Sequence, residues 1–436
     1  IKDMGGLLRP LAAKKLVTEL KQVTDLPIHL HTHDTSGNQI AALMMAADAG
    51  VDIVDTAISS MSSLTSQPSM NSLVTALEGG DRDTGFKPRQ LQKLSDYWED
   101  TRKYYSGFEG DIKVPETEIY RYEIPGGQYT NLKPQVESLG LGHQFEEVKE
   151  KYSEVNDLLG GVIKVTPSSK MVGDFAIFMV QNKLDRENLL ERGKELTFPR
   201  SVVDYFKGMM GQSTFPLPQE LSQVVLKGEK PLDTLPSKLL PPADFDAIVK
   251  KLQKINPNAG LRQAIAYCLY PQVVEDFLAG YETYGDISQM PSDIFFYGME
   301  RGESMEMSIE EGKTLMIKYI GPGERNDDGT LELQFELNGS RRNVLIRDPH
   351  AEVEAEQIRL ASAEDKTEIG ATIMGAVSRM AVKPGDKVKK GDVVAIVEAM
   401  KMETGISAAI DGTVEAVYAQ PGDVVQAGQL LVRLKI

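Results

Sequence analysis

The 436-residue sequence has a single cysteine, Cys268, and therefore cannot form a disulfide within the chain. The apolar surroundings of Cys268 predict a buried thiol without a reactive role. Long apolar runs are also missing, so no segment of the sequence is long enough to cross a bilayer. Basic residues are in the minority, with 48 Lys and Arg against 64 Asp and Glu. This deficit disfavours binding to nucleic acid or to a membrane surface, because both need a positive stripe.

The sequence also lacks an initiator methionine and a targeting peptide, since it begins Ile1-Lys2-Asp3-Met4. We expect it to be part of a longer polypeptide, so the missing leader says nothing about the compartment. Its composition, 41% hydrophobic and 26% charged, is ordinary for a globular protein. The length is enough for about two to four domains.

Helix and strand patterns alternate near the N-terminus. Apolar spacing predicts helices at residues 7–22, 38–49 and 69–77, and short strands at 26–33 and 52–56. This alternation indicates parallel βα units, whose functional residues lie at the carboxyl ends of the strands. Residues 1–80 alone could not bury the edges of such a sheet, so we expect the functional polypeptide to be longer.

The pattern changes twice after the βα units. From residue 88 to 284 it is mostly helical, and it then switches to the two-residue period of strands. The Asn338-Gly339 pair predicts a tight hairpin turn in this β-rich part. The predicted strands are residues 294–297, 315–319, 331–337 and 343–346.

The last segment contains an internal repeat with an offset of 37 residues. The Gly-Ala-Val at 375–377 recurs as Gly-Thr-Val at 412–414, and the Pro-Gly-Asp at 384–386 recurs at 421–423. Gly391 likewise recurs as Gly428. Two short β-halves related in this way predict a flattened barrel with pseudo-two-fold symmetry and one shared core.

Lys401 lies between the two halves, where a hairpin should join them. One interpretation is an ordinary surface lysine in a turn, but the methionines on both sides favour recognition by a modifying enzyme. The Ala-Met-Lys-Met at 399–402 resembles the signature of biotinyl domains, and the resemblance covers residues 369–436. Lipoyl domains share the fold but usually have Asp before the lysine and Ala after it. The resemblance implies that a biotin protein ligase attaches biotin to Lys401.

Three of the five histidines are His29, His31 and His33. On a strand, alternate residues project to one face, so two of these imidazoles can chelate one metal ion. Imidazole suits Zn²⁺, and additional oxygen ligands would favour Mn²⁺. The alternative is a polar strand end with hydrogen-bonded histidines.

Two sequence motifs that include or accompany the histidines resemble motifs of a known enzyme family. The His-Thr-His-Asp at 31–34 resembles the metal motif of TIM-barrel carboxyltransferases, and the Lys-Asp-Met-Gly-Gly at 2–6 resembles their carboxylated-lysine motif. The resemblance implies that Lys2, His31 and His33 bind the metal. Carboxylation would convert the Lys2 ammonium, which repels a cation, into an anionic carbamate. The family also uses an Asp from its first strand, and this sequence lacks that residue.

The Val-Thr-Pro-Ser-Ser-Lys at 165–170 by itself predicts a turn or a helix cap. It resembles a carboxyltransferase motif. The resemblance implies that Thr166 shuttles a proton between pyruvate and biotin, while Ser169 and Lys170 hold the biotin. A hydroxyl suits this task because it both donates and accepts hydrogen bonds.

A carboxyltransferase and a biotin carrier on one chain occur in the pyruvate carboxylase family and in the α subunit of oxaloacetate decarboxylase. No long Pro/Ala-rich linker of the decarboxylase type is present, and residues 294–347 resemble the allosteric and tetramerisation region of pyruvate carboxylases. The resemblance implies carboxylation of pyruvate to oxaloacetate by a homotetramer. It also implies an ATP- and Mg²⁺-dependent part outside this sequence and an effector such as acetyl-CoA or a nucleotide. The decarboxylase subunit and a non-catalytic biotin carrier remain as alternatives.

The expected fold is α/β with three parts. Residues 1–285 form the last strands of a TIM-barrel carboxyltransferase and a helical extension. Residues 286–364 form a small β-rich allosteric and tetramerisation module with a linker, and residues 365–436 form the all-β biotin carrier domain. The resemblance implies a bacterial cytoplasm or a eukaryotic mitochondrial matrix as the compartment.

Overall fold

The computed structural model describes residues 1–211, 213, 215–310, 312–326, 328–348, 359–362, 365–399 and 402–435. The chain divides into two compact units. The first combines Ile1–Ser237 with Ile358–Ile436, and the second is Lys238–Gln357. Within the described residues, no helix is both long and apolar enough to cross a membrane.

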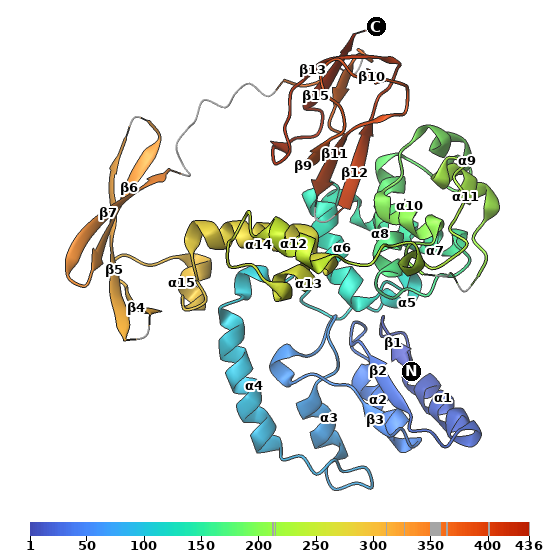
Figure 1. Cartoon of the computed structure of the whole chain (residues 1–436). Coiled ribbons are helices and arrows are strands. Elements are labelled where there is room, and N and C mark those ends of the chain that lie inside the picture. Colours follow the sequence, from blue (N-terminus) through green and yellow to red (C-terminus); the bar gives the residue numbers. More distant parts are fainter. Residues whose placement is uncertain are drawn as a thin grey trace. The chain divides into compact units, whose positions relative to one another are not determined.

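The N-terminal part is a three-stranded parallel sheet in the order β1-β2-β3, with helices between its strands (Figure 1). The predicted alternation of helix and strand is therefore confirmed. Ala13 and Val17 of α1 pack with Leu30 of β2 and Leu43 of α2 in a small buried core. The elements are β1 (Lys2–Asp3), α1 (Pro10–Val23), β2 (His29–Thr32), α2 (Gln39–Asp48), β3 (Ile53–Val54), η1 (Ser59–Met61) and α3 (Met70–Leu77).

Helices dominate the remainder of residues 1–237, as the sequence pattern predicts. The central helix is α8, which is buried along most of its length and contacts α6, α7 and α10. Met171, Phe175 and Met179 of α8 have no exposed surface. The elements are α4 (Pro88–Lys103), η2 (Ser106–Phe108), α5 (Ile119–Tyr122), α6 (Gly126–Ser138), η3 (Gly142–Gln144), α7 (Phe145–Leu158), α8 (Ser168–Gln181), α9 (Leu189–Arg192), η4 (Gly193–Glu195), α10 (Arg200–Lys207) and α11 (Gln219–Leu226).

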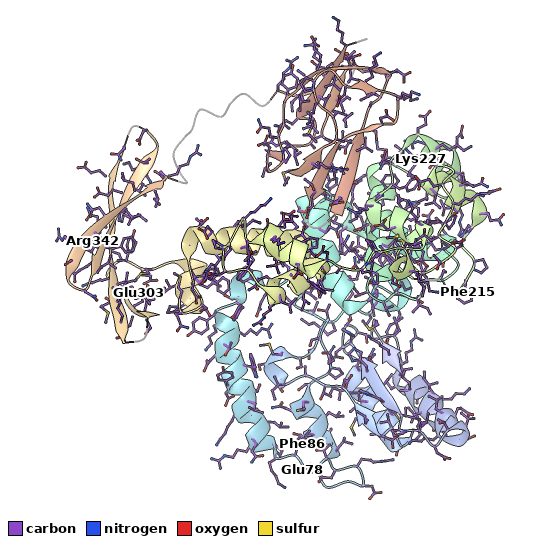
Figure 2. The ribbon with its side chains drawn as sticks, viewed as in Figure 1. Glu78, Phe86, Phe215, Lys227, Glu303 and Arg342 are labelled. Atoms are coloured by element: carbon purple, nitrogen blue, oxygen red, sulfur yellow. The ribbon has the colours of Figure 1, made fainter. Side chains whose placement is uncertain are left out.

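The second unit contains helices followed by a four-stranded antiparallel sheet in the order β4-β5-β6-β7. Asn338 and Gly339 both have positive φ, 47° and 81°, which confirms the tight turn between β6 and β7. Figure 2 shows Arg342 on β7, a strand whose residues are nearly all exposed. The short helix η5 (Pro236–Lys238) crosses the boundary between the two units. The elements of the second unit are α12 (Phe245–Leu252), α13 (Leu261–Leu269), α14 (Pro271–Tyr284), α15 (Ser292–Tyr297), β4 (Ser304–Glu310), β5 (Lys313–Arg325), β6 (Thr330–Leu337) and β7 (Ser340–Arg347).

Two predictions for the second unit were wrong. Residues 294–297 belong to the short helix α15 and not to a strand. Asp293 stands in the first turn of α15 and Gly298, with φ 76°, ends it, and these terminal signals outweigh the β propensity of the aromatic residues. Cys268 is exposed and not buried. It lies in the last turn of α13, where Leu269 is 67% exposed as well.

The C-terminal domain consists of two four-stranded sheets, in the orders β10-β13-β15-β8 and β12-β11-β9-β14. Each sheet takes two strands from the first half of the repeat and two from the second. The two halves therefore share one core, which includes Val377, Val397, Val414 and Leu434. The strands are β8 (Glu368–Gly370), β9 (Gly375–Met380), β10 (Lys387–Val388), β11 (Val393–Ala399), β12 (Met402–Ser407), β13 (Gly412–Val417), β14 (Val424–Val425) and β15 (Leu430–Lys435).

The pseudo-two-fold symmetry extends to individual hydrogen bonds. The Gly385 amide donates to the Val414 carbonyl over 2.8 Å, and the equivalent Gly422 amide donates to the Val377 carbonyl, also over 2.8 Å. The Asp of each Pro-Gly-Asp turn accepts a bond from the amide three residues earlier, at 2.8 Å for Asp386 and 2.7 Å for Asp423. Each turn is thus fastened to the opposite half, as the repeat predicts.

Strands β11 and β12 form the hairpin expected around Lys401 (Figure 1). Glu398 pairs with Glu403, and Ala399 pairs with Met402, in antiparallel register. Met400 and Lys401 connect the two strands and lie outside the described residues, as does the 349–358 part of the predicted linker.

Candidate active site

Lys2 lies directly opposite His31 at the edge of the parallel sheet. The register of β1 and β2 pairs Lys2 with His31 and Asp3 with Thr32. His33 follows the end of β2, and its ring centroid is 5.2 Å from that of His31, with the two ring planes 72° apart. The fold thus brings together three residues that are separated by up to 31 positions in the sequence.

Asp55 at the end of β3 holds two of the histidines. Its Oδ1 lies 2.7 Å from Nε2 of His29, and its Oδ2 lies 2.8 Å from Nδ1 of His31. Although partial burial acts to raise the pKa of Asp55, the hydrogen bonds from His29 and His31 outweigh it and hold this pKa below its usual value. Because Nδ1 of His31 is engaged, its Nε2 is the nitrogen left for a metal.

His33 is oriented by a backbone carbonyl. Its Nδ1 donates to the Thr65 carbonyl oxygen over 2.6 Å, so the lone pair of the neutral ring is on Nε2. The side chain is buried, and desolvation lowers the pKa of His33 despite the opposing effect of the Thr65 hydrogen bond. A lowered pKa keeps the imidazole neutral, which is the form that binds metals.

Asp3 shapes the loop that follows β1. Its carboxylate accepts bonds from the amides of Leu7 and Leu8, each over 2.9 Å, and from the Thr32 hydroxyl over 2.8 Å. Gly6 in this loop has φ 72°, and a Cβ there would lie 2.2 Å from the His33 carbonyl oxygen. The second glycine of the Lys-Asp-Met-Gly-Gly motif therefore allows two backbone segments to approach beside His33.

The residues that the sequence predicts to bind a metal supply two imidazoles at this edge of the sheet. Among the described residues, no group of three or more His, Cys, Asp or Glu side chains could hold a metal. His31 and His33 each use Nδ1 for a hydrogen bond within the described part of the chain, which leaves Nε2 as the nitrogen for a metal, and Lys2 is the residue paired with His31. His29 differs from them in that its Nε2, and not its Nδ1, is bound to Asp55.

Thr166 lies just before α8 and is exposed. Ser168 organises this turn: its hydroxyl accepts from the Val165 amide over 3.2 Å and donates to the Ile163 carbonyl over 2.6 Å. Ser169 in the first turn of α8 is buried, and its carbonyl accepts from the Tyr152 hydroxyl over 3.4 Å. The predicted turn and helix start are therefore confirmed, and they present the Thr166 side chain at the surface.

Lys170 pairs with Asp174 one helical turn later. Asp174 is only 1% exposed and also accepts from the Ser201 hydroxyl over 2.6 Å and from Nε2 of Gln135 over 3.1 Å. The ammonium group of Lys170, whose side chain is 37% exposed, is thus held in place by a buried carboxylate. Sequence reasoning missed Asp174, whose only local signal is its i+4 spacing from Lys170.

The end of the β11–β12 hairpin next to its turn contributes to a cavity beside Lys170. The cavity has a volume of about 310 Å³, and Nη1 of Arg200 lies 3.1 Å from Oε2 of Glu403. Glu398 and Glu403 flank the Met400-Lys401 connection from either strand. The lining residues are Lys170, Asp174, Arg200, Ser201, Glu398 and Glu403, with three others.

Three family models match consecutive parts of the chain. The HMGL-like family matches residues 1–97, the conserved carboxylase domain matches residues 119–318, and the biotin-requiring enzyme family matches residues 366–434. The combination of a carboxylase region with a biotin-carrier domain defines the class of biotin-dependent carboxylases.

Individual relatives show which family of biotin-dependent carboxylases the chain resembles. Pyruvate carboxylase from Bacillus subtilis is 48% identical over 405 residues, and the one from Staphylococcus aureus is 46% identical. Each match covers 93% of this chain and 35% of the relative, so the chain spans about a third of the length of these relatives. The chain belongs to the pyruvate carboxylase family and corresponds to the C-terminal portion of its members.

Solved structures give the same result. The carboxyl transferase domain of Rhizobium etli pyruvate carboxylase, solved with pyruvate and biocytin, has a TM-score of 0.74 and 43% identity. It covers 80% of this chain, and the match extends over 59% of that domain. The complete multifunctional enzyme from the same organism matches 99% of this chain and 40% of its own length, with a TM-score of 0.73 and 41% identity.

Proposed function

We propose that this chain transfers a carboxyl group from biotin on Lys401 to pyruvate and so forms oxaloacetate. The observation that carries the proposal is the pairing of Lys2 with His31 beside His33, in a chain that also contains a biotin-carrier domain. The Rhizobium etli domain with pyruvate and biocytin supports this choice of substrates at 43% identity.

Lys2, as its carbamate, and the Nε2 atoms of His31 and His33 would hold a Mn²⁺ or Zn²⁺ ion. When bound, the metal supplies Lewis acidity that favours the enolate of pyruvate. Asp55 and the Thr65 carbonyl keep the two imidazoles in the required tautomer through their bonds to Nδ1. The parallel sheet β1-β2-β3 would form part of an eight-stranded TIM barrel whose other strands lie outside this chain.

The residues around α8 would handle biotin and the proton. The Thr166 hydroxyl takes a proton from the pyruvate methyl group and passes it to the ureido nitrogen of biotin. Ser169 and Lys170 bind the biotin head, and Asp174 fixes the Lys170 ammonium for this purpose. The cavity that Lys170 shares with Glu398 and Glu403 supports this assignment, because these two glutamates flank the carrier lysine.

We assign residues 1–285 to carboxyl transfer, 286–364 to an allosteric and tetramerisation region and 365–436 to the biotin carrier. The ATP- and Mg²⁺-dependent carboxylation of biotin would take place in the part of the relatives' length that this chain does not cover. A homotetramer, a biotin protein ligase and an effector such as acetyl-CoA or a nucleotide complete the proposed partners.

Exchange of label between [¹⁴C]pyruvate and oxaloacetate tests the half-reaction directly, because it needs only the carboxyltransferase and biotin; it is measured in the longer polypeptide that supplies the remaining strands of the barrel. We expect exchange that avidin abolishes and that is accompanied by one Mn²⁺ or Zn²⁺ ion per chain. A biotinylated protein without exchange and without metal would be a carrier subunit only. Net carboxylation of pyruvate that depends on ATP and bicarbonate separates the enzyme from an oxaloacetate decarboxylase.

A further inference from the structure

Gly126, the first residue of α6, lies against the ring of His33. A Cβ at Gly126 would be 2.8 Å from Nδ1 of His33, 3.3 Å from its Cγ and 2.9 Å from the Thr65 carbonyl oxygen. The neighbouring Gly127 is different, since a Cβ there would meet no atom within 4 Å. Only the first glycine of the pair therefore has a steric reason to lack a side chain.

A side chain at Gly126 would collide with both atoms of the hydrogen bond that orients His33. Nδ1 of His33 and the Thr65 carbonyl oxygen are 2.6 Å apart, and both would be closer than 3.0 Å to a methyl group on Gly126. The Thr65 oxygen belongs to the backbone and cannot move without moving its loop. The imidazole ring would have to turn away instead, and its Nε2 would turn with it.

The surroundings of Gly126 hold it firmly in this place. Its amide donates to the Met4 carbonyl over 2.9 Å, which ties α6 to the loop that follows Lys2. The Thr130 hydroxyl, one turn along α6, donates to Oγ1 of Thr65 over 2.7 Å and lies 3.2 Å from the Gly126 carbonyl oxygen. The start of α6, the Thr65 loop and the edge of the sheet thus form one connected arrangement around His33.

We infer that Gly126 is a positioning residue for the metal site: its bare backbone keeps the His33 ring bonded to Thr65, with Nε2 directed to the ion shared with His31 and Lys2. This inference rests on the proposed metal site and extends it to a residue of the helical extension. Groups that orient a metal-binding histidine typically change metal affinity by about 10- to 100-fold when they are altered. We expect the Gly126→Ala protein to lose affinity for Mn²⁺ or Zn²⁺ within that range.

The test compares Gly126→Ala with Gly127→Ala in the intact biotinylated protein. Bound metal is measured by elemental analysis after equilibration with graded concentrations of a chelator, at a temperature well below the unfolding midpoint. Gly127→Ala should retain the metal affinity of the parent protein, because its added methyl group enters open space. Equal affinities for both variants and the parent, with unchanged unfolding midpoints, would overturn the role of Gly126.

Two further variants keep the result interpretable. If Gly126→Ala does not fold, Thr130→Val decides, since it removes the hydroxyl that holds Thr65 and should also weaken metal binding; parent-like affinity in Thr130→Val then counts against the inference. His31→Asn separates this inference from the proposed function. Loss of metal in His31→Asn but not in Gly126→Ala refutes the positioning role alone, whereas retention of metal in His31→Asn refutes the metal site itself.

Discussion

Asp55 accepts a hydrogen bond from Nδ1 of His31 over 2.8 Å, although the two residues are 24 positions apart in the sequence. The same carboxylate bonds to His29, so one side chain that follows β3 orders two imidazoles of β2. Replacement of Asp55 by Ala should free the His31 ring to rotate. We expect metal affinity to fall about 10- to 100-fold, measured by chelator competition.

A surface variant provides the control for Asp55→Ala. Asp25 is exposed at the approach to β2, so Asp25→Ala removes the same charge from the same region without touching a histidine. An equal loss of metal in both variants would indicate a general effect of charge and contradict the orienting role of Asp55.

Thr166→Ala tests the proposed proton transfer. The protein should remain biotinylated and keep its metal, but pyruvate–oxaloacetate exchange should fall about 10²- to 10⁴-fold, the usual contribution of general acid–base catalysis. Thr166→Ser retains a hydroxyl and should recover most of the rate. Exchange near the parent rate in Thr166→Ala excludes Thr166 as the proton carrier.

Asp174→Asn should separate the placement of Lys170 from its charge. The amide can still bond to Ser201 and Gln135, but it no longer attracts the Lys170 ammonium. Misplacement of a binding group by about 1 Å can cost about 100-fold in rate, and we expect an exchange rate lowered by that order. Metal content should not change, because Asp174 contacts α8, α6 and α10 residues and not the histidines. A lower metal content would mean that the substitution disturbs the fold more widely.

Arg200 and Glu403 provide a charge-swap experiment on the carrier domain. The pair is exposed, with side-chain accessibilities of 72% and 31%, so each charge reversal should leave thermal stability nearly unchanged. We expect Arg200→Glu and Glu403→Arg each to lower the exchange rate several-fold, and the double variant to restore it. Additive losses in the double variant would show that the two side chains do not act as a pair.

Gly6 and Gly85 allow us to measure how much a close backbone neighbour contributes to the destabilisation caused by an added side chain. Both have φ 72°, but a Cβ on Gly6 would lie 2.2 Å from the His33 carbonyl oxygen, whereas a Cβ on Gly85 would meet nothing within 4 Å. Alanine at either position has the cost of the left-handed conformation, about 1–2 kcal/mol. Gly6→Ala should lower the free energy of unfolding by a further 1–3 kcal/mol or so, measured by urea denaturation. Equal losses for the two variants would show that the loop relaxes at Gly6 without cost.

Features that depend on neighbouring residues or on the internal repeat could be predicted from the sequence. The Asn338-Gly339 turn was predicted because its two positive φ angles suit these residue types. The strand predicted at 294–297 was wrong because the helix-terminal signals of Asp293 and Gly298 outweigh the β propensity of the aromatic residues between them. Burial of Cys268 was also wrong, since apolar neighbours along a helix do not reveal which part of that helix another element covers.

The sequence alone determined the carrier domain. A repeat offset of 37 residues fixes which turns are equivalent, and each Pro-Gly-Asp turn is built by a bond from its own Asp to an amide three residues away. It also marked Lys2, His31 and His33 by motif. Only the tertiary structure decided which atoms of the histidines are free, because the groups that hold them come from other elements: Asp55 is 24 residues from His31, and Thr65 is 32 residues from His33. Gly126 belongs to the same class, since the need for a missing side chain arises from the approach of α6 to His33, and no local pattern in the sequence encodes that approach.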